Sequence, residues 1–179
     1  MTLKKHKVVI LGAGAIGLST AVALKQAGID VAIISNKSSE NTDTKQHKKN
    51  TSPPWFRDPW VCALNEASKQ WLDHCGIWSS LDEEGIGTYY DVILYDHRGK
   101  ETLAFHAAEL GYPALGYVVS QKRMNVHLYR RAAELGIKIY HADSTAYDAT
   151  QHILTLSNGY RLSSDCFLAA DGRHSWFRK

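Results

Sequence analysis

The sequence is poor in cysteine and contains no long apolar run. Its 179 residues include three cysteines and no Cys-x-x-Cys pair, and an odd count argues against a disulfide framework. No stretch approaches the ~18 apolar residues that a membrane span needs, and the N-terminus lacks the small-residue cleavage site of a signal peptide. We therefore expect a protein of a reducing, cytoplasmic compartment without a transmembrane segment.

Neither sign of charge dominates the chain. The 21 Lys and Arg residues stand against 18 Asp and Glu residues, a net charge of +3, and the basic residues are scattered, so we expect no nucleic-acid partner. The nine histidines are also scattered, and no pair has the His-x3-His spacing of a helical metal site, so we expect no metal. No nucleophile, base and orienting group stand together in a pattern, so we predict no catalytic side chain.

The N-terminal region has the pattern of a βαβ unit. Val8–Leu11 is a short apolar run rich in β-branched residues, as in a buried strand. Apolar residues at helical spacing then predict a helix over Ile16–Ala27, and Gly28 follows as a natural stop. Val31–Ile34 reads as a second buried strand, which completes the unit.

The remaining chain alternates predicted helices with short strands. Residues 36–54 contain no apolar side chain except prolines and predict a mobile surface loop. The other expected elements are a helix within Trp60–Trp78, strands over 88–96 and 102–105 joined by a turn at 97–100, a helix over Gln121–Leu135, a strand over Ile137–His141, an antiparallel meander of Ala146–Asp148, Ile153–Leu156 and Tyr160–Leu162, and a strand over Cys166–Ala170.

Glycines 12, 14 and 17 form the G-x-G-x-x-G pattern between the first strand and the first helix. Gly12 would allow the tight turn, Gly14 the close approach of a pyrophosphate, and Gly17 the close packing of helix on strand. Free N–H groups and the positive end of the helix dipole favour phosphate at this place. The segment therefore predicts a dinucleotide site made of Gly12, Ala13, Gly14, Ala15, Ile16 and Gly17.

The acid that usually follows this motif by about 20 residues, on the ribose hydroxyls, is absent. The second strand ends in Ser35, followed by Asn36 and Lys37. Ser35 can make one hydrogen bond but offers no bidentate carboxylate. Either these three residues accommodate the 2′-phosphate of NADP, or the site has lost part of its hold on the adenosine. We favour the second interpretation, because a lysine in a polar run is usually only solvated.

The last predicted strand runs into Asp171 and Gly172, and Ser175 is a candidate cap for a helix that would start there. With GAGAIG near the N-terminus, the segment AADGRHSWFR resembles the FAD-dependent aromatic hydroxylases of the para-hydroxybenzoate hydroxylase type. Within them it is most similar to the ubiquinone-biosynthesis hydroxylases. Stretches over 61–68, 75–78 and 115–119 agree with this resemblance.

The resemblance implies an α/β fold. We expect a Rossmann-type FAD-binding domain over residues 1–78 and 120–179, with part of an inserted β-rich substrate subdomain over 79–119. It also implies that the cofactor is FAD, held by the glycine motif and by Ser35, Gln121, Asp171 and Gly172. NAD(P)H would be the electron donor, and an aromatic or quinone-precursor ring would be hydroxylated with O2. A polyprenylated substrate would place the protein at the periphery of the inner membrane.

Three departures from the family qualify this expectation. Ser35 replaces the ribose-binding acid, and Trp60 falls where an arginine beside the cofactor is usual. The family also continues well past the Asp171-Gly172 motif, so the chain is expected to be its N-terminal part. Besides a monooxygenase, the sequence leaves open a non-catalytic remnant, one half of a split enzyme completed by a separate chain, and an NADP-binding oxidoreductase.

Overall fold

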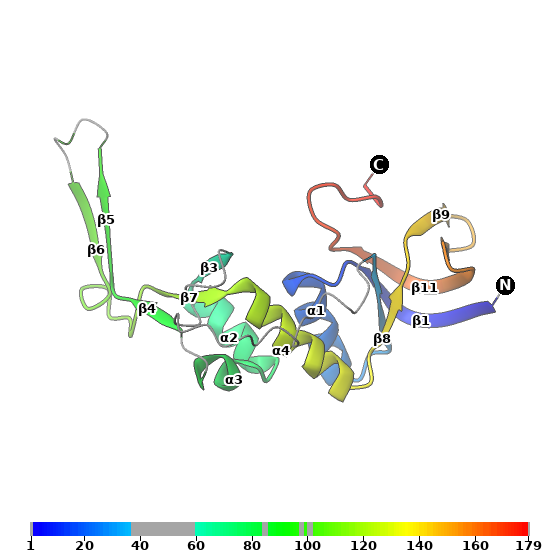
Figure 1. The fold of residues 1–179 in the computed structure, drawn as a ribbon, viewed down its shortest axis with the longest axis horizontal. Helices are drawn as coiled ribbons and strands as arrows, with labels where there is room; N and C mark the ends of the chain where they lie inside the picture. The colour runs from blue at the N-terminus through cyan, green and yellow to red at the C-terminus, as the bar shows by residue number, and fades with distance from the viewer. Residues whose placement is uncertain (1, 37–59, 84–85, 97–98, 100–101, 179) are drawn as a thin grey trace, which may run out of the picture. The chain divides into compact units, whose positions relative to one another are not determined.

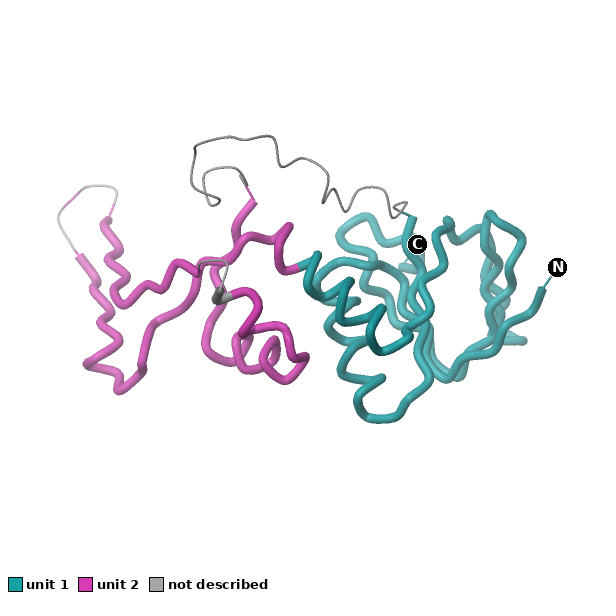
Figure 2. The backbone as a smooth tube through the Cα atoms, turned by 60° about the horizontal axis from the view of Figure 1, so that its bottom comes forward, with its two compact units in different colours: residues 1–50, 125–179 teal, residues 51–124 magenta. Residues whose placement is uncertain are grey.

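The computed structural model describes residues 2–36, 60–83, 86–96, 99 and 102–178. The predicted loop over 36–54 lies outside this part of the chain except for Asn36, and so does the predicted turn at 97–100 except for Gly99. The chain forms two compact units, residues 1–50 with 125–179 (unit 1) and residues 51–124 (unit 2) (Figure 2). Each is described by itself below.

Unit 1 is built around one mixed sheet (Figure 1). Its elements are β1 (Thr2–Leu11), α1 (Ala15–Gln26), β2 (Val31–Ser35), β8 (Lys138–His141), β9 (Ser144–Asp148), β10 (Ile153–Leu156) and β11 (Tyr160–Ala169). In the described residues the strand order is β8-β2-β1-β11-β10-β9. The first four strands are parallel, whereas β10 and β9 are antiparallel additions. This parallel core with a helix after its first strand is the α/β fold that the sequence predicts.

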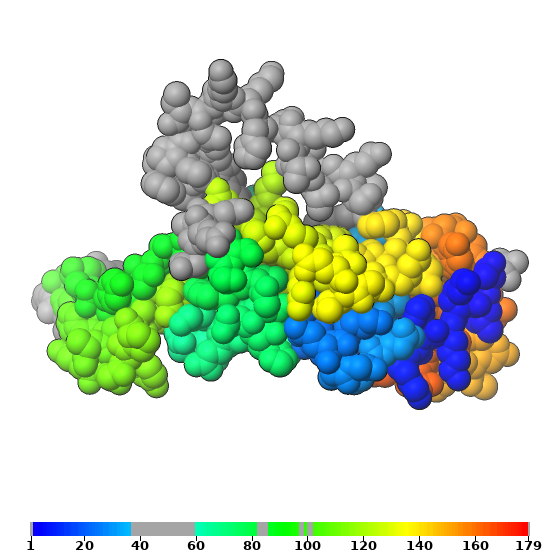
Figure 3. Space-filling model, turned by 90° about the horizontal axis from the view of Figure 1, so that it is seen from below, coloured from blue at the N-terminus to red at the C-terminus, as the bar shows by residue number. Residues whose placement is uncertain are grey.

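Two apolar layers cover the sheet because side chains alternate along each strand. Val9 and Leu11 of β1 pack on one face with Tyr140 and the meander residues Leu154 and Leu162. The opposite face carries Ile10 and Ile33, both fully buried. Here α1 and the C-terminal turns of α4 (Gln121–Glu134) lie side by side (Figures 1 and 3). Leu18 of α1 and Leu128 of α4 are fully buried, and each such side chain stabilises the fold by about 1.5–3 kcal/mol.

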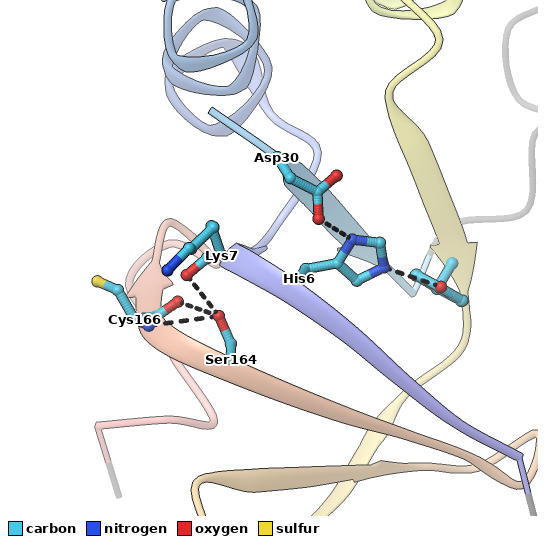
Figure 4. Close-up of polar contacts among 6 residues, drawn as sticks. His6, Lys7, Asp30, Ser164 and Cys166 are labelled. Carbon is cyan, nitrogen blue, oxygen red and sulfur yellow. Dashed lines mark hydrogen bonds and ion pairs between the residues drawn. The ribbon is translucent and has the colours of Figure 1, made fainter. Parts of the chain in front are cut away.

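Polar contacts fix the N-terminal half of β1 in this sheet (Figure 4). His6 Nδ1 lies 2.9 Å from Asp30 Oδ2, and His6 Nε2 lies 3.1 Å from the Tyr140 hydroxyl. On the other side of the strand, the buried Ser164 hydroxyl lies 3.0 Å from the Lys7 carbonyl oxygen. It also accepts a hydrogen bond from the Cys166 N–H at 3.3 Å. These contacts join β1 to both parallel neighbours and hold their register.

In its described residues, unit 2 contains two small antiparallel sheets, two short helices and the start of α4. Its elements are β3 (Val61–Leu64), α2 (Glu66–His74), α3 (Trp78–Glu83), β4 (Gly87–Tyr89), β5 (Asp91–Tyr95), β6 (Thr102–His106) and β7 (Gly116–Ser120); the boundary between the units falls within α4. One sheet has the order β3-β7-β4, and β5 pairs with β6 in the other. The predicted substrate subdomain over 79–119 includes β4 to β6 and most of β7, and its separate role stays a prediction.

Two local predictions are wrong, and one is made narrower. The helix predicted within Trp60–Trp78 is α2, which begins at Glu66 because the Asn65 side chain accepts a hydrogen bond from Ser68 N–H at 2.9 Å; Val61–Leu64 before it is a strand on β7. The strands predicted over 160–162 and 166–170 are one strand, β11, because its polar residues pair with β1: Ser163 lies opposite Lys5. Beyond Gly172, the described residues form turns up to Arg178 instead of the start of a helix.

Candidate functional site

The candidate site lies where the carboxyl ends of β1, β2 and β11 meet. The Gly12 N–H, just after β1, donates to the Ile34 carbonyl oxygen of β2 at 2.8 Å. On the other side, the Ala170 N–H donates to the Leu11 carbonyl oxygen, also at 2.8 Å. The chain leaves β1 between its two parallel neighbours and turns at once into α1 (Figure 1). In open α/β sheets, ligands bind in the crevice at this kind of position.

Gly12 and Gly17 are required by the protein's own packing. Gly12 has φ +108°, which L side chains rarely adopt, and a Cβ there would collide with the Ala170 carbonyl oxygen. A Cβ on Gly17 would collide with the Gly12 carbonyl oxygen. These two glycines therefore allow the turn after β1 and the close approach of α1 to it, as the sequence predicts.

Gly14 has no such requirement in the described structure. It is the residue before α1, with φ −82° and ψ −179°, a conformation open to any residue. A Cβ placed on it would meet no atom within 4 Å. Neither the backbone nor the neighbouring side chains need a glycine here. An external group that approaches the backbone closely, such as the pyrophosphate that the sequence predicts, would need one.

The electrostatics at the start of α1 favour an anion. The first turn of the helix contains no acidic residue, and no side chain of the described chain caps it. Its leading N–H groups have no acceptor within the helix, and the helix dipole adds positive potential at this end. Ala13 and Ala15 are partly exposed and Ile16 is 73% exposed. The segment thus presents backbone donors around the open space at Gly14.

Asp171 stands two residues after β11, beside the same turn. Its Oδ2 accepts a hydrogen bond from the Trp176 N–H at 2.8 Å. Its Oδ1 is buried and has no hydrogen bond of good geometry with any described residue. The Ser175 hydroxyl, likewise buried without such a bond, is close enough to Asp171 to interact with its carboxyl. Gly172 follows with φ +81° and carries the chain through the turn. A buried acceptor oxygen without a donor is uncommon in a folded protein, and the Ser175 hydroxyl is the neighbouring group that could supply one.

The surroundings of the Asp171 carboxyl favour its ionised form. Burial raises the pKa of its carboxyl, but the neighbouring Ser175 hydroxyl and the backbone N–H groups of Trp176 and Phe177 outweigh it. The pKa of Asp171 therefore lies below its ordinary value. At neutral pH this side chain is a charged acceptor at the edge of the sheet.

The two remaining predicted site residues are Ser35 and Gln121. Ser35 ends β2 with its side chain buried, and its carbonyl oxygen accepts from the Ala142 N–H at 3.0 Å. Gln121 lies in unit 2 at the start of α4, where its N–H donates to the Trp60 carbonyl oxygen at 3.0 Å. Its predicted place against a flavin stays a prediction.

The sequence interpretation missed what holds the Asp171 segment in place. Phe177 packs in an aromatic cluster with Tyr147 and Phe167, at ring-centroid distances of 4.9 and 6.0 Å. Together with the Asp171–Trp176 hydrogen bond, this anchors the turn on the meander face of the sheet. The only sequence signal was an aromatic residue six positions after Asp171, which does not indicate its partners.

Metal clusters and membrane-spanning helices were sought in the described part of the chain. No group of three or more His, Cys, Asp or Glu side chains there could hold a metal ion. Nor is any helix there long and apolar enough to cross a membrane.

The parallel sheet, the glycine turn and the open start of α1 define a Rossmann-type dinucleotide-binding domain. Comparison with known families gives a narrower assignment: the sequence profile of the FAD binding domain family matches residues 5–179. The chain belongs to this family.

Solved structures share the fold at low sequence identity. A probable FAD-dependent monooxygenase from Pseudomonas aeruginosa, PqsL, has a TM-score of 0.73 at 16% identity over 98% of this chain and 44% of its own. The p-nitrophenol 4-monooxygenase PnpA from Pseudomonas putida has 0.72 at 20%, over 99% and 43%. A 2-methyl-3-hydroxypyridine-5-carboxylic acid oxygenase has 0.69 at 22%, over 96% and 41%. The chain thus spans less than half the length of these structures. No curated protein matches it.

Proposed function

We propose that the chain is the FAD-binding part of a flavin-dependent monooxygenase that acts on an aromatic ring. One observation carries the proposal: Gly14 has an ordinary conformation and an open Cβ position, at the uncapped start of α1. A dinucleotide pyrophosphate accounts for a glycine that the protein itself does not need. Membership of the FAD binding domain family favours FAD as that dinucleotide.

Each predicted site residue has a role in this proposal. The backbone from Gly12 to Gly17 binds the pyrophosphate, and Gly172 permits close approach of the ligand. Asp171 Oδ1, which makes no hydrogen bond among the described residues, accepts one from a sugar or ribityl hydroxyl. Ser35 makes a single hydrogen bond near the adenosine. For Gln121, the resemblance implies a polar contact with the FAD.

The bound FAD would supply the redox chemistry. Two electrons come from NAD(P)H, one atom of O2 enters the ring, and the other leaves as water. The protein's part is to bind and orient the cofactor, and the proposal needs no catalytic side chain.

The finer substrate class is a polyprenylated phenol of ubiquinone biosynthesis. Its support is the resemblance of the sequence at GAGAIG, AADGRHSWFR and the intermediate stretches. In this reading the protein is cytoplasmic and associates peripherally with the inner membrane to reach its substrate. Because the relatives are more than twice as long as the matched region, activity requires the remaining part of their fold, which a separate chain can supply.

Reconstitution tests the cofactor. The purified chain is incubated with FAD, and bound flavin is measured by visible absorbance and by calorimetric titration. Gly14→Ala is expected to lower FAD affinity at least about tenfold, or about 1.4 kcal/mol, with little change in the stability of the unbound fold. Gly87→Ala is the matched control: Gly87 lies in unit 2, and its Cβ would make only ordinary contact with Val118.

Two results would overturn the assignment. One is a chain that binds no FAD although circular dichroism shows it to be folded. The other is tighter binding of NADPH than of FAD, which would favour the NADP-binding alternative predicted for Ser35, Asn36 and Lys37.

A further inference from the structure

A phenol, an imidazole and a carboxylate form a hydrogen-bonded chain in unit 1. His6 Nδ1 lies 2.9 Å from Asp30 Oδ2 (Figure 4), and His6 Nε2 lies 3.1 Å from the Tyr140 hydroxyl. Tyr140 is 5% exposed, and the His6 side chain is 14% exposed. The proposed function gives none of these three residues a role.

The Asp30 carboxylate sets the direction of these hydrogen bonds. A carboxylate only accepts hydrogen bonds, so Nδ1 of the imidazole carries the hydrogen. In the neutral imidazole Nε2 is then the acceptor, and the Tyr140 hydroxyl donates to it. The Asp30 carbonyl oxygen accepts from the Val8 N–H at 3.1 Å, which holds Asp30 beside β1. Tyr140 therefore has a base within the distance of about 2.6–3.2 Å that proton transfer requires.

This arrangement suits a phenol that loses an electron and a proton together. Burial raises the pKa of the Tyr140 phenol, so the hydroxyl keeps its proton until the ring is oxidised. The Lys138 ammonium lies 5.8 Å from the ring centroid and opposes a positive charge on the ring. Loss of an electron must therefore be accompanied by loss of the proton. His6 Nε2 is positioned to accept it, and Asp30 then stabilises the imidazolium.

A second phenol connects Tyr140 to the surface. The rings of Tyr140 and Tyr160 pack edge to face, with their centroids 5.5 Å apart. Tyr160 is 37% exposed, whereas Tyr140 is buried. The two side chains are chemically identical, so the imidazole beside Tyr140 decides on which ring an oxidising equivalent comes to rest.

We propose that Tyr160 and Tyr140 form a one-electron relay from a dissolved oxidant, such as a peroxyl radical, to a buried phenol. The oxidant takes an electron from Tyr160, and the hydroxyl proton of Tyr160 goes to water. An electron then passes from Tyr140 to Tyr160, which takes a proton back from water, while the Tyr140 proton moves to His6 Nε2. The products are an intact Tyr160, a neutral phenoxyl radical on Tyr140 and an imidazolium paired with Asp30. The relay does not depend on bound flavin.

Flash photolysis tests the relay on the full chain, with a photogenerated ruthenium(III) complex as the dissolved oxidant. Phenoxyl absorbance gives the rate of formation and the lifetime, and electron paramagnetic resonance of frozen samples identifies the radical. The chain is expected to form a long-lived tyrosyl radical in a step that is independent of protein concentration. Tyr140→Phe should remove this radical, and Tyr160→Phe should slow its formation.

Two variants test the proton acceptor. His6→Gln should shorten the lifetime of the radical at least about tenfold, because the amide is a far weaker base than imidazole. Asp30→Asn keeps an acceptor for His6 Nδ1–H but removes the charge that stabilises the imidazolium, so its lifetime should lie between those of the unaltered chain and His6→Gln. The g-tensor reports the hydrogen bond to the phenoxyl oxygen, which a purely structural role of His6 would not change.

Tyr147→Phe is the matched control. Tyr147 lies in the same unit and also packs edge to face on an aromatic ring, that of Phe167, with centroids 5.3 Å apart. This variant should leave the yield and the lifetime of the radical unchanged. Thermal unfolding checks that every variant is folded.

Three outcomes would overturn the proposal. In the first, Tyr140→Phe retains the long-lived radical. In the second, a folded His6→Gln variant gives the same lifetime and the same g-tensor as the unaltered chain. In the third, Tyr160→Phe forms the radical at an unchanged rate, which would show that oxidation reaches Tyr140 by another route.

Discussion

The Asp171 carboxylate caps the turn that follows it, through a 2.8 Å hydrogen bond from the Trp176 N–H to Oδ2. Its other oxygen, Oδ1, is buried without a hydrogen bond to any described residue. One side chain therefore stabilises the turn with one oxygen, and the second is the one that the proposed function assigns to a ligand hydroxyl. Structural and binding effects of Asp171 should accordingly be separable.

Asp171→Asn is expected to weaken FAD binding by about tenfold or more, because hydrogen bonds to a charged acceptor contribute about 1.5–3 kcal/mol. The loss of stability should be smaller, since the amide oxygen can still accept from the Trp176 N–H. Calorimetric titration with FAD and thermal unfolding measure the two effects.

Asp148 provides the control for this substitution. It also caps a turn, with Oδ1 accepting from the N–H groups of Thr150 and Gln151 at 2.9 and 3.0 Å. It lies at the end of β9, in the meander. Asp148→Asn should lower stability by a similar amount and leave FAD affinity unchanged. Equal losses of affinity in the two variants would contradict a ligand-binding role for Asp171.

Acid stability should depend on Ser175. Because the pKa of Asp171 is lowered in the folded chain from its ordinary 3.8, its contribution to stability is present above that value and is lost as the pH falls through the lower folded pKa. Ser175→Ala removes one cause of the lowered pKa, so it should raise the pKa of Asp171 and move acid unfolding to higher pH. Carboxyl NMR titration reports the first effect and circular dichroism the second. In an Asp171→Asn background, Ser175→Ala should no longer move the midpoint.

Gly17→Ala should destabilise unit 1 with or without ligand. Its added Cβ would meet the Gly12 carbonyl oxygen, which belongs to the backbone and cannot move alone. Overpacking of this kind typically costs about 1–3 kcal/mol. Thermal unfolding should show this loss for Gly17→Ala, whereas Gly14→Ala unfolds near the unchanged midpoint. Equal stability of Gly17→Ala and Gly14→Ala would contradict the conclusion that Gly17 is needed for packing and Gly14 is not.

The sequence predicts local patterns well and long-range pairing poorly. The helix after the glycine turn was predicted within one residue at each end, because its apolar spacing is local, whereas β1 begins six residues before the predicted strand at Val8. The continuity of β11 was missed, because Ser163 to Asp165 look like a polar break. They remain a strand because they pair with β1, and Lys7 Nζ lies 2.8 Å from Asp165 Oδ2 across 158 positions.

The same limit applies to the site. The glycine motif and Asp171 could be proposed from sequence, because each is defined by neighbours in the chain. A Cβ added at Gly14 would meet no atom, whereas one added at Gly17 would collide. This difference depends on atoms of Gly12 and Ala170 that only the fold brings near. The anchoring of the turn by Phe177 likewise depends on Tyr147, far away in the sequence.

The stability of the β5–β6 hairpin in unit 2 should depend on pH. The hydrogen bond to Asp91 raises the pKa of His106 above its ordinary 6.5. Their pairing therefore stabilises the hairpin fully below pH 6.5, and this contribution is lost as the pH rises through the higher folded pKa. NMR titration of the imidazole measures the shift, and Asp91→Asn should move the pKa of His106 back toward 6.5. A pKa of His106 that does not change in Asp91→Asn would assign the shift to another group.

The proposed place of Ser35 at the adenosine end of a dinucleotide can be tested by substitution. Ser35 ends β2 next to the glycine turn, with its side chain 3% exposed. Ser35→Glu would place a carboxylate where ribose hydroxyls are usually bound. An unpaired buried charge lowers stability, so the unbound chain should unfold at lower temperature. FAD, whose hydroxyls can pair with the carboxylate, should bind about tenfold more tightly, about 1.4 kcal/mol. NADPH should bind more weakly, because its 2′-phosphate is repelled.

Ser35→Gln, of the same size without the charge, should give neither effect. Calorimetric titration of both dinucleotides measures this, and equal weakening of FAD and NADPH in Ser35→Glu would show that neither places its ribose at the end of β2.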